Sequence, residues 1–181
     1  MIRNWYAAVS WWRDLQPDPE RQYPGDRATL ARLRRCGDIA ELMLEPATIG
    51  LFRRVEADRA DDLPLVALAA GVLAHVRADE PAILVARQIG PDNPDKPETA
   101  LMKPLRFRRL MEAETPDERL IAFRRLVALA RNTLSARDLA GSLLGWTDER
   151  RRRWALAYWN ADPLSLGAAP AAENKSVKEI A

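Results

Sequence analysis

The sequence predicts an all-α protein, folded as one compact helical bundle or as two packed helical subdomains. Apolar residues recur at helical spacing along most of the chain, and no segment shows sustained alternation of apolar and polar residues. The 181 residues are 48% apolar and 30% charged, so the chain can bury a core without disulfides. Only Ile83–Val85 has the composition of a short strand.

Residues 1–90 are predicted to form an N-terminal helical subdomain. Asp26 has the side chain that caps a helix start, and Pro46 and Pro64 suit the first turns of two later helices. The helix after Asp62 is apolar on most sides, which predicts that it lies at the centre of the fold. The expected helices cover residues 4–15, 27–36 and 38–44, a stretch from Pro46, residues 64–78 and a short turn or two at 81–89.

The second half of the chain is predicted to be a separate, basic helical subdomain. Residues 91–104 contain four prolines and indicate a linker. Residues 105–160 carry a capping box, Thr115 with Glu118, that marks the start of one helix. Ser135 and Thr147 are expected to cap two more helices. The composition of residues 161–181 predicts a flexible tail.

Charge is distributed unevenly along the chain. The net charge is only +2, but residues 103–159 carry 13 basic and 7 acidic side chains, a net charge of +6. Arginine supplies 24 of the 28 basic residues. A genome rich in G and C would explain the preference for arginine over lysine but not the clustering. The basic block therefore predicts an anionic partner.

Side chains suited to catalysis or metal binding are scarce in the sequence. His75 is the single histidine, and a metal site needs about three protein ligands. Cys36 is the single cysteine, expected to be a buried thiol, so no internal disulfide is possible. There is no phosphate-binding glycine loop, and the linker carboxylates are expected to be solvated. We therefore predict no enzyme activity, no metal and no cofactor, and a cytoplasmic protein without a secretory signal or membrane span.

The arginines are the residues that point to a function. Guanidinium groups match phosphate oxygens and stack on unpaired bases. Any single arginine is more often part of a solvated face braced by ion pairs. On helical geometry, Arg124 and Arg131 lie along the edge of an apolar stripe, and Arg125 points outward. Rows on neighbouring helices predict one continuous, solvent-open positive strip for a sugar-phosphate backbone.

An ordered series of motifs over about residues 5–160 resembles the small subunit of the CRISPR Cascade surveillance complex, the CasB-type family of type I-E systems. The series comprises Trp11-Trp12-Arg13-Asp14-Leu15, Gly25-Asp26-Arg27-Ala28-Thr29-Leu30 leading into Leu33-Arg34-Arg35, Phe107-Arg108-Arg109-Leu110, Phe123-Arg124-Arg125-Leu126, Leu143-Leu144-Gly145-Trp146 and Arg153-Trp154-Ala155.

The resemblance implies a non-catalytic, all-helical subunit that braces the complex and holds nucleic acid while the guide pairs with target DNA. It implies as partners the backbone repeats, the large subunit, a second copy of the chain, guide RNA and target DNA. Base pairing would then read the sequence, and this subunit would contact the target or displaced strand through phosphates. The arginines that match the family motifs are the first candidates for these contacts: Arg34, Arg35, Arg108, Arg109, Arg124 and Arg125. The second candidates are Arg27, Arg106, Arg131, Arg150, Arg151, Arg152 and Arg153.

Three other functions remain open at this point. A helical protein-protein adaptor would use its arginines on acidic protein surfaces and never contact nucleic acid. Trp11, Trp146 and Trp159, which are less clearly inward than the other tryptophans, could serve such an interface. A small helical enzyme would need carboxylates clustered on helices, and a helix-turn-helix repressor would need a helix pair joined by a short glycine turn. Neither pattern is evident in the sequence.

Overall fold

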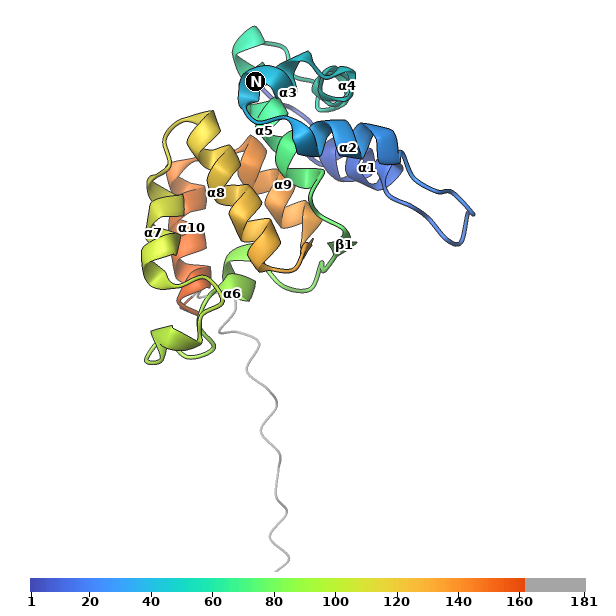
Figure 1. Cartoon of the computed structure of the whole chain (residues 1–181). Coiled ribbons are helices and arrows are strands. Elements are labelled where there is room, and N and C mark those ends of the chain that lie inside the picture. The colour runs from blue at the N-terminus through green and yellow to red at the C-terminus, as the bar shows by residue number, and fades with distance from the viewer. Residues whose placement is uncertain (162–181) are drawn as a thin grey trace, which may run out of the picture.

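A computed structural model describes residues 1–161, which form ten α-helices, two 3-10 turns and one very short sheet (Figure 1). The all-α class is confirmed. None of the helices in this range is both long and apolar enough to cross a bilayer. The α-helices are α1 (Ala7–Leu15), α2 (Arg27–Arg35), α3 (Ile39–Leu44), α4 (Pro46–Arg54), α5 (Leu63–Leu73), α6 (Val85–Ile89), α7 (Pro104–Glu112), α8 (Pro116–Leu129), α9 (Ala136–Leu144) and α10 (Asp148–Tyr158); the 3-10 turns are η1 (Ala60–Asp62) and η2 (Pro97–Thr99).

The helix starts follow the capping signals in the sequence. The Thr115 side chain accepts a hydrogen bond from the Glu118 backbone N–H, and the Glu118 carboxylate accepts one from the Thr115 N–H. This reciprocal pair is the predicted capping box. Asp26, Ser135 and Thr147 cap α2, α9 and α10 in the same way, each accepting from a backbone N–H three residues later.

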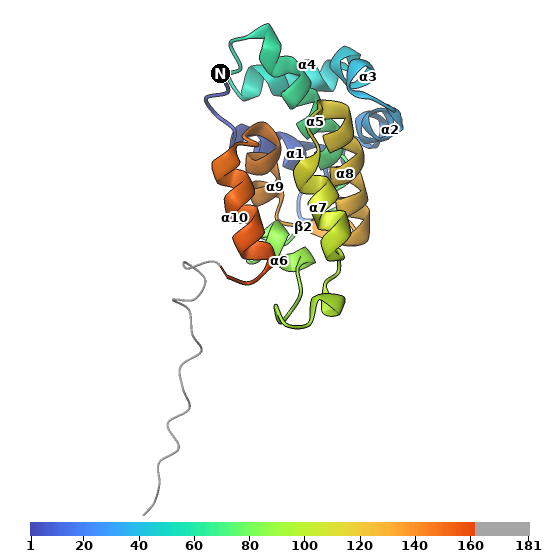
Figure 2. The ribbon, with the colours of Figure 1, turned by 90° about the vertical axis from the view of Figure 1, so that its left-hand side faces the viewer.

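Helix α5 lies at the centre of the core, as its apolar composition predicts. Every residue from Val66 to Leu73 is buried. The helix contacts α3, α4, α8 and α9, so elements from both predicted subdomains pack against it (Figures 1 and 2). One continuous hydrophobic cluster runs from α1 to α10. The two predicted halves thus share a single core.

The proline-rich stretch 91–104 packs against this core. Ala100 and Met102 are buried, and the Met102 N–H donates to the Ile89 carbonyl at 2.9 Å. The Tyr158 hydroxyl donates to the Met102 carbonyl at 2.7 Å, which joins the segment to α10. Proline content predicts interrupted helix but not this packing, which depends on two apolar side chains. Of the predicted tail, residues 162–181 lie outside the described residues.

A parallel pair of two-residue strands joins segments far apart in the chain. Ala78 and Asp79 of β1 (Ala78–Asp79) pair with Thr133 and Leu134 of β2 (Thr133–Leu134). The strand suggested at residues 83–85 is wrong, because Val85 begins α6 instead. Its N–H donates to the Asp138 carboxylate at 2.9 Å, which anchors the start of α6 against α9.

The tryptophans proposed for an interface are mostly core residues. Trp11 is 4% exposed and Trp146 is 8% exposed. Trp146 makes an edge-on contact with Trp154 at a centroid distance of 5.1 Å, and both rings pack edge-on against Phe123. Trp159 is half-buried. The aromatic cluster between α8 and α10 therefore stabilises the fold rather than offering Trp146 to a partner.

Candidate nucleic-acid interface

Arg34, Arg77 and Arg124 lie near His75, and the Arg77 backbone lies beside the Arg131–Asn132 turn. Arg34 belongs to α2, Arg77 follows α5, Arg124 belongs to α8 and Arg131 follows α8. We call these four residues the basic face. Packing of α2, α5 and α8 against one another, together with the β1–β2 pair, brings the segments that carry them together (Figure 1).

Arg124 forms the partly buried base of this face. Its guanidinium donates to the carbonyls of Cys36 at 2.7 Å, Leu33 at 3.1 Å and Gly71 at 3.2 Å. The first two carbonyls belong to the C-terminal end of α2 and the third to α5. A cation at a helix C-terminus satisfies carbonyls that lack helical partners and opposes their negative dipole. Arg124 therefore ties α8 to α2 and α5.

Arg34 is also partly engaged with the backbone. Its Nε donates to the Ala74 carbonyl at 2.7 Å, just after α5. Burial, and then the positive charge of Arg77, lowers the pKa of the Arg34 guanidinium. The second cause means that the two cations lie close enough to repel one another. An anion placed between them would relieve this repulsion.

Arg77 and Arg131 have exposed side chains, and the backbone segments that carry them are neighbours. The Arg77 N–H donates to the Asn132 carbonyl at 2.8 Å, so Arg77 lies beside the residue that follows Arg131. Arg131 itself has a positive φ of 55°, a conformation that needs support from its surroundings. Within residues 1–161, no carboxylate lies within 4 Å of any of the four guanidiniums. The face is therefore positive and unneutralised in this part of the chain.

His75 lies beneath the basic face and is neutral at pH 7. Burial, followed by the charges of Arg124, Arg34 and Arg77, lowers its pKa to about 4. Its Nε2 is buried without a hydrogen-bond partner in the described residues, whereas its backbone carbonyl accepts from Asn132. No group of three or more His, Cys, Asp or Glu side chains suited to a metal occurs between residues 1 and 161.

We expect the protein to lose stability as pH falls from about 6.5 towards about 4, partly because His75 must take up a proton. A histidine whose folded pKa is lowered contributes stability that is complete above its unfolded pKa, about 6.5, and disappears as pH falls towards the folded value. Urea unfolding of wild type and His75→Gln between pH 7 and 5 measures this contribution. The variant should show a shallower loss of unfolding free energy, and identical slopes would contradict the expectation.

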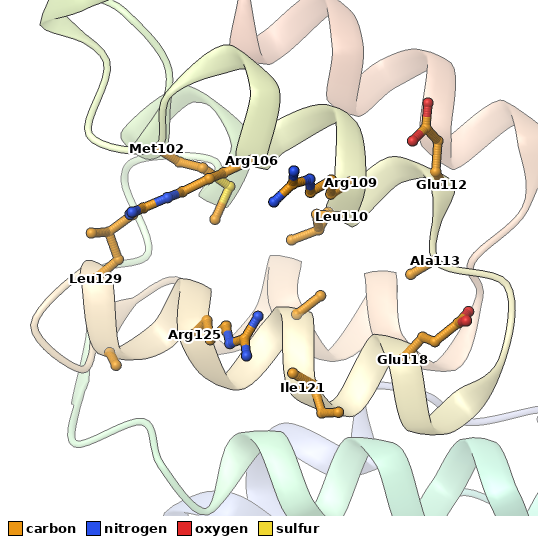
Figure 3. Close-up of a pocket in the computed structure, with 12 residues that line it drawn as sticks. Met102, Arg106, Arg109, Leu110, Glu112, Ala113, Glu118, Ile121, Arg125 and Leu129 are labelled. Atoms are coloured by element: carbon orange, nitrogen blue, oxygen red, sulfur yellow. The ribbon is translucent and has the colours of Figure 1, made fainter.

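A second group of arginines lines a groove between α7 and α8. Arg106 and Arg109 extend from α7, and Arg125 extends from α8 towards them (Figure 3). The groove has a volume of about 950 Å³, at the upper end of the usual range for ligand sites. We call it the α7–α8 groove. Its remaining lining residues are Met102, Leu110, Glu112, Ala113, Glu118, Ile121, Ala122, Ala128 and Leu129.

The arginine run at the start of α10 is mostly neutralised. Arg150 lies 4.0 Å from Asp138, and the other two ion pairs are local. They join Arg151 to Asp148 at 3.0 Å and Arg153 to Glu149 at 2.6 Å. The run is therefore braced by carboxylates, as the ordinary interpretation of a charged helix predicts.

The remaining candidates are exposed but dispersed. Arg27 and Arg35 lie at opposite ends of α2, Arg108 lies on α7 and Arg152 on α10. None of the four has a carboxylate partner among the described residues. The thirteen candidates thus divide among the basic face, the α7–α8 groove, the α10 run and these single positions. The one continuous strip expected from the sequence stays a prediction.

Sequence reasoning missed Arg77. It lies in the half of the chain that carries a net negative charge, outside every arginine row on a helix. Its position depends on the β1–β2 pair, and strands of two residues leave no alternating pattern. The available signal was its place two residues after His75, at the end of the apolar central helix.

The fold and these surfaces define a class: an all-helical protein with clustered arginines on its exterior. The family model described as CRISPR-associated protein Cse2 matches residues 29–159, and the chain belongs to this family. The family predicted by resemblance is confirmed.

A solved structure supports the fold. The chain is similar to a chain of E. coli Cascade bound to a PAM-containing dsDNA target, with a TM-score of 0.58 and 19% sequence identity. The similarity covers 89% of this chain and 97% of the other. No match is found among curated protein sequences.

Proposed function

We propose that the chain is a non-catalytic subunit of a CRISPR RNA-guided DNA surveillance complex, where it braces the assembly and holds the target or displaced DNA strand. Membership of the Cse2 family supports this role. The similar E. coli chain comes from a Cascade complex bound to double-stranded DNA. By this proposal the partners are other Cascade subunits, a second copy of the chain, guide RNA and target DNA.

The basic face is the observation that supports DNA contact most strongly. Its cations come from separate segments and have no carboxylate partners in the described residues, so helix stability does not account for their grouping. Arg124 and Arg34 hold the base in place, and the exposed Arg77 and Arg131 are free to contact phosphate oxygens. Strand exchange during guide pairing is nearly balanced in free energy, so a few phosphate contacts are enough to favour the bound state.

Replacing Arg77 and Arg131 together with glutamine is expected to weaken target DNA binding by the assembled complex. Each phosphate contact contributes about 0.9 to the slope of log affinity against log salt on duplex and about 0.7 on a single strand. The double variant should therefore flatten the slope by about 1.4 to 1.8. Binding titrations of the reconstituted complex at several salt concentrations measure both quantities.

The matched control replaces two exposed arginines that already have acidic partners. Arg21 pairs with Asp18 and Arg59 with Asp61, and neither arginine belongs to the basic face. Arg21→Gln with Arg59→Gln should leave the affinity and the salt slope unchanged. An unchanged slope in a correctly assembled Arg77/Arg131 variant would remove the basic face from the proposal.

A protein-protein adaptor is the second candidate, and exposed apolar residues near the α7–α8 groove favour it. Leu105 is 59% exposed and Ile121 is 49% exposed. A salt titration of single-stranded DNA binding by the isolated protein separates the two functions. Absence of binding even at low salt favours the adaptor, because phosphate contacts strengthen as salt is removed.

A further inference from the structure

The α7–α8 groove differs chemically between its two ends. Arg106 lies near the start of α7 and reaches towards Leu129, and Arg109 and Arg125 face each other nearer the middle of the groove (Figure 3). Glu112 and Glu118 lie at the other end, where the chain turns from α7 into α8. The groove therefore has one positive end and one negative end.

The positive end has unused hydrogen-bonding capacity. All three arginines are exposed, and none has a carboxylate partner within the described residues. At the other end, the Glu118 carboxylate already accepts hydrogen bonds from the backbone N–H groups of Glu114 and Thr115. Glu112 is exposed. The groove thus offers three free cations from its middle to one end and negative charge at the other end.

The surface between the two ends is apolar. Leu110 and Met102 are almost fully buried beneath the groove. Ile121 and Ala128 are exposed along it, and Leu129 is half-buried. An apolar strip between two packed helices matches the groove that a third amphipathic helix occupies in many complexes.

We propose that the α7–α8 groove docks an amphipathic helix of a partner protein, with carboxylates that meet the arginines and apolar side chains that cover the strip. Ile121 to Leu129 spans about 12 Å along α8, so the contact suits about two to three helical turns. The helix dipole sets the direction, because a positive N-terminus is favoured near Glu112 and a negative C-terminus near Arg106.

A nucleic-acid strand fits this groove less well. A strand lying along it would carry phosphates past Glu112 and Glu118, where like charges repel. Its phosphates would also meet apolar side chains between the two ends. In the basic face, by contrast, no carboxylate of the described residues lies within 4 Å of an arginine. The two surfaces are therefore assigned to different partners. The groove inference rests on the proposed role as a subunit of a complex but does not depend on the basic face.

Site-specific crosslinking tests the occupant directly. A benzophenone amino acid replaces Ile121 in the full chain, the complex is assembled and irradiated, and the crosslinked peptide is sequenced by mass spectrometry. The expected product joins position 121 to a partner-protein segment with apolar residues at helical spacing and Asp or Glu beside them, with or without target DNA. Crosslinks to nucleic acid, to residues 162–181 of the same chain, or to no partner protein would overturn the inference.

Charge reversal supplies a second measurement. Arg109→Glu with Arg125→Glu should weaken association of the subunit with the rest of the complex by about tenfold or more, because the partner's carboxylates would face like charges. The control, Arg53→Glu with Lys96→Glu, makes the same charge change on exposed residues outside the groove. Equal weakening by both pairs, or unchanged association of the groove pair, would contradict the inference. The Arg77/Arg131 variant should associate normally, which separates this result from the DNA-binding proposal.

Discussion

Replacing Arg124 with methionine is expected to lower the free energy of unfolding by about 3 kcal/mol, because hydrogen bonds to a charged donor contribute about 1.5–3 kcal/mol each and are not additive. The substitution keeps most of the aliphatic stem but removes the donors that reach Leu33, Cys36 and Gly71. Three carbonyls at the junction of α2, α5 and α8 then lose their partner. Urea unfolding followed by circular dichroism measures the loss, with an unchanged slope m.

The adjacent residue provides the control. Arg125 is exposed and has no hydrogen-bond partner in the described part of the chain, so Arg125→Met should change the unfolding free energy by no more than about 0.5 kcal/mol. Equal stabilities of the two variants would refute the bracing role of Arg124. The two neighbouring arginines of one sequence motif thus have separable roles. A double Arg124/Arg125 variant would not separate an effect on stability from an effect on binding.

Replacing Trp154 with alanine is expected to cost about 3–5 kcal/mol, the range for deleting a buried aromatic side chain. Trp154 is 3% exposed, and its Nε1 donates to the Ser142 hydroxyl at 2.9 Å. Its ring also packs edge-on against Phe123 and Trp146. The substitution leaves a cavity among three helices and removes the hydrogen bond that the Ser142 hydroxyl accepts, although that hydroxyl still donates to the Asp138 carbonyl.

Leu156, two residues later on the same helix, is the matched control for Trp154. It is 41% exposed, so Leu156→Ala should cost less than about 1 kcal/mol. Thermal and urea unfolding of both variants give the comparison. A loss below about 1.5 kcal/mol for Trp154→Ala would mean that α10 contributes little to the shared core.

The sequence predicts the helices well because their signals are local. Thr115 and Glu118 lie three residues apart, and the capping box depends only on that spacing. The uniformly apolar stretch of α5 likewise determines its central position. The β1–β2 pair was not predictable in this way, because its register depends on how α5, α8 and α9 pack.

The candidate site was only partly predictable for the same reason. The sequence places Arg124 at the edge of an apolar stripe, and that position suits both a solvent-facing cation and one that reaches a neighbouring backbone. The carbonyls that decide between them belong to residues 53 to 91 positions away. The position of Arg77 was not predictable, because the other residues of the basic face are distant from it in sequence. Helical periodicity predicts which side of a helix a residue occupies. It does not predict which groups of other segments face that side.

The β1–β2 pair has a consequence for protein synthesis. It places Arg77 beside the Arg131–Asn132 turn through a contact between positions 55 residues apart. A growing polypeptide that ends before this turn contains Arg34 and Arg77. It lacks Arg131, which completes the basic face, and Asn132, which contacts Arg77. By the proposed function, the DNA-contacting surface is therefore complete only after the Arg131–Asn132 turn has been synthesised.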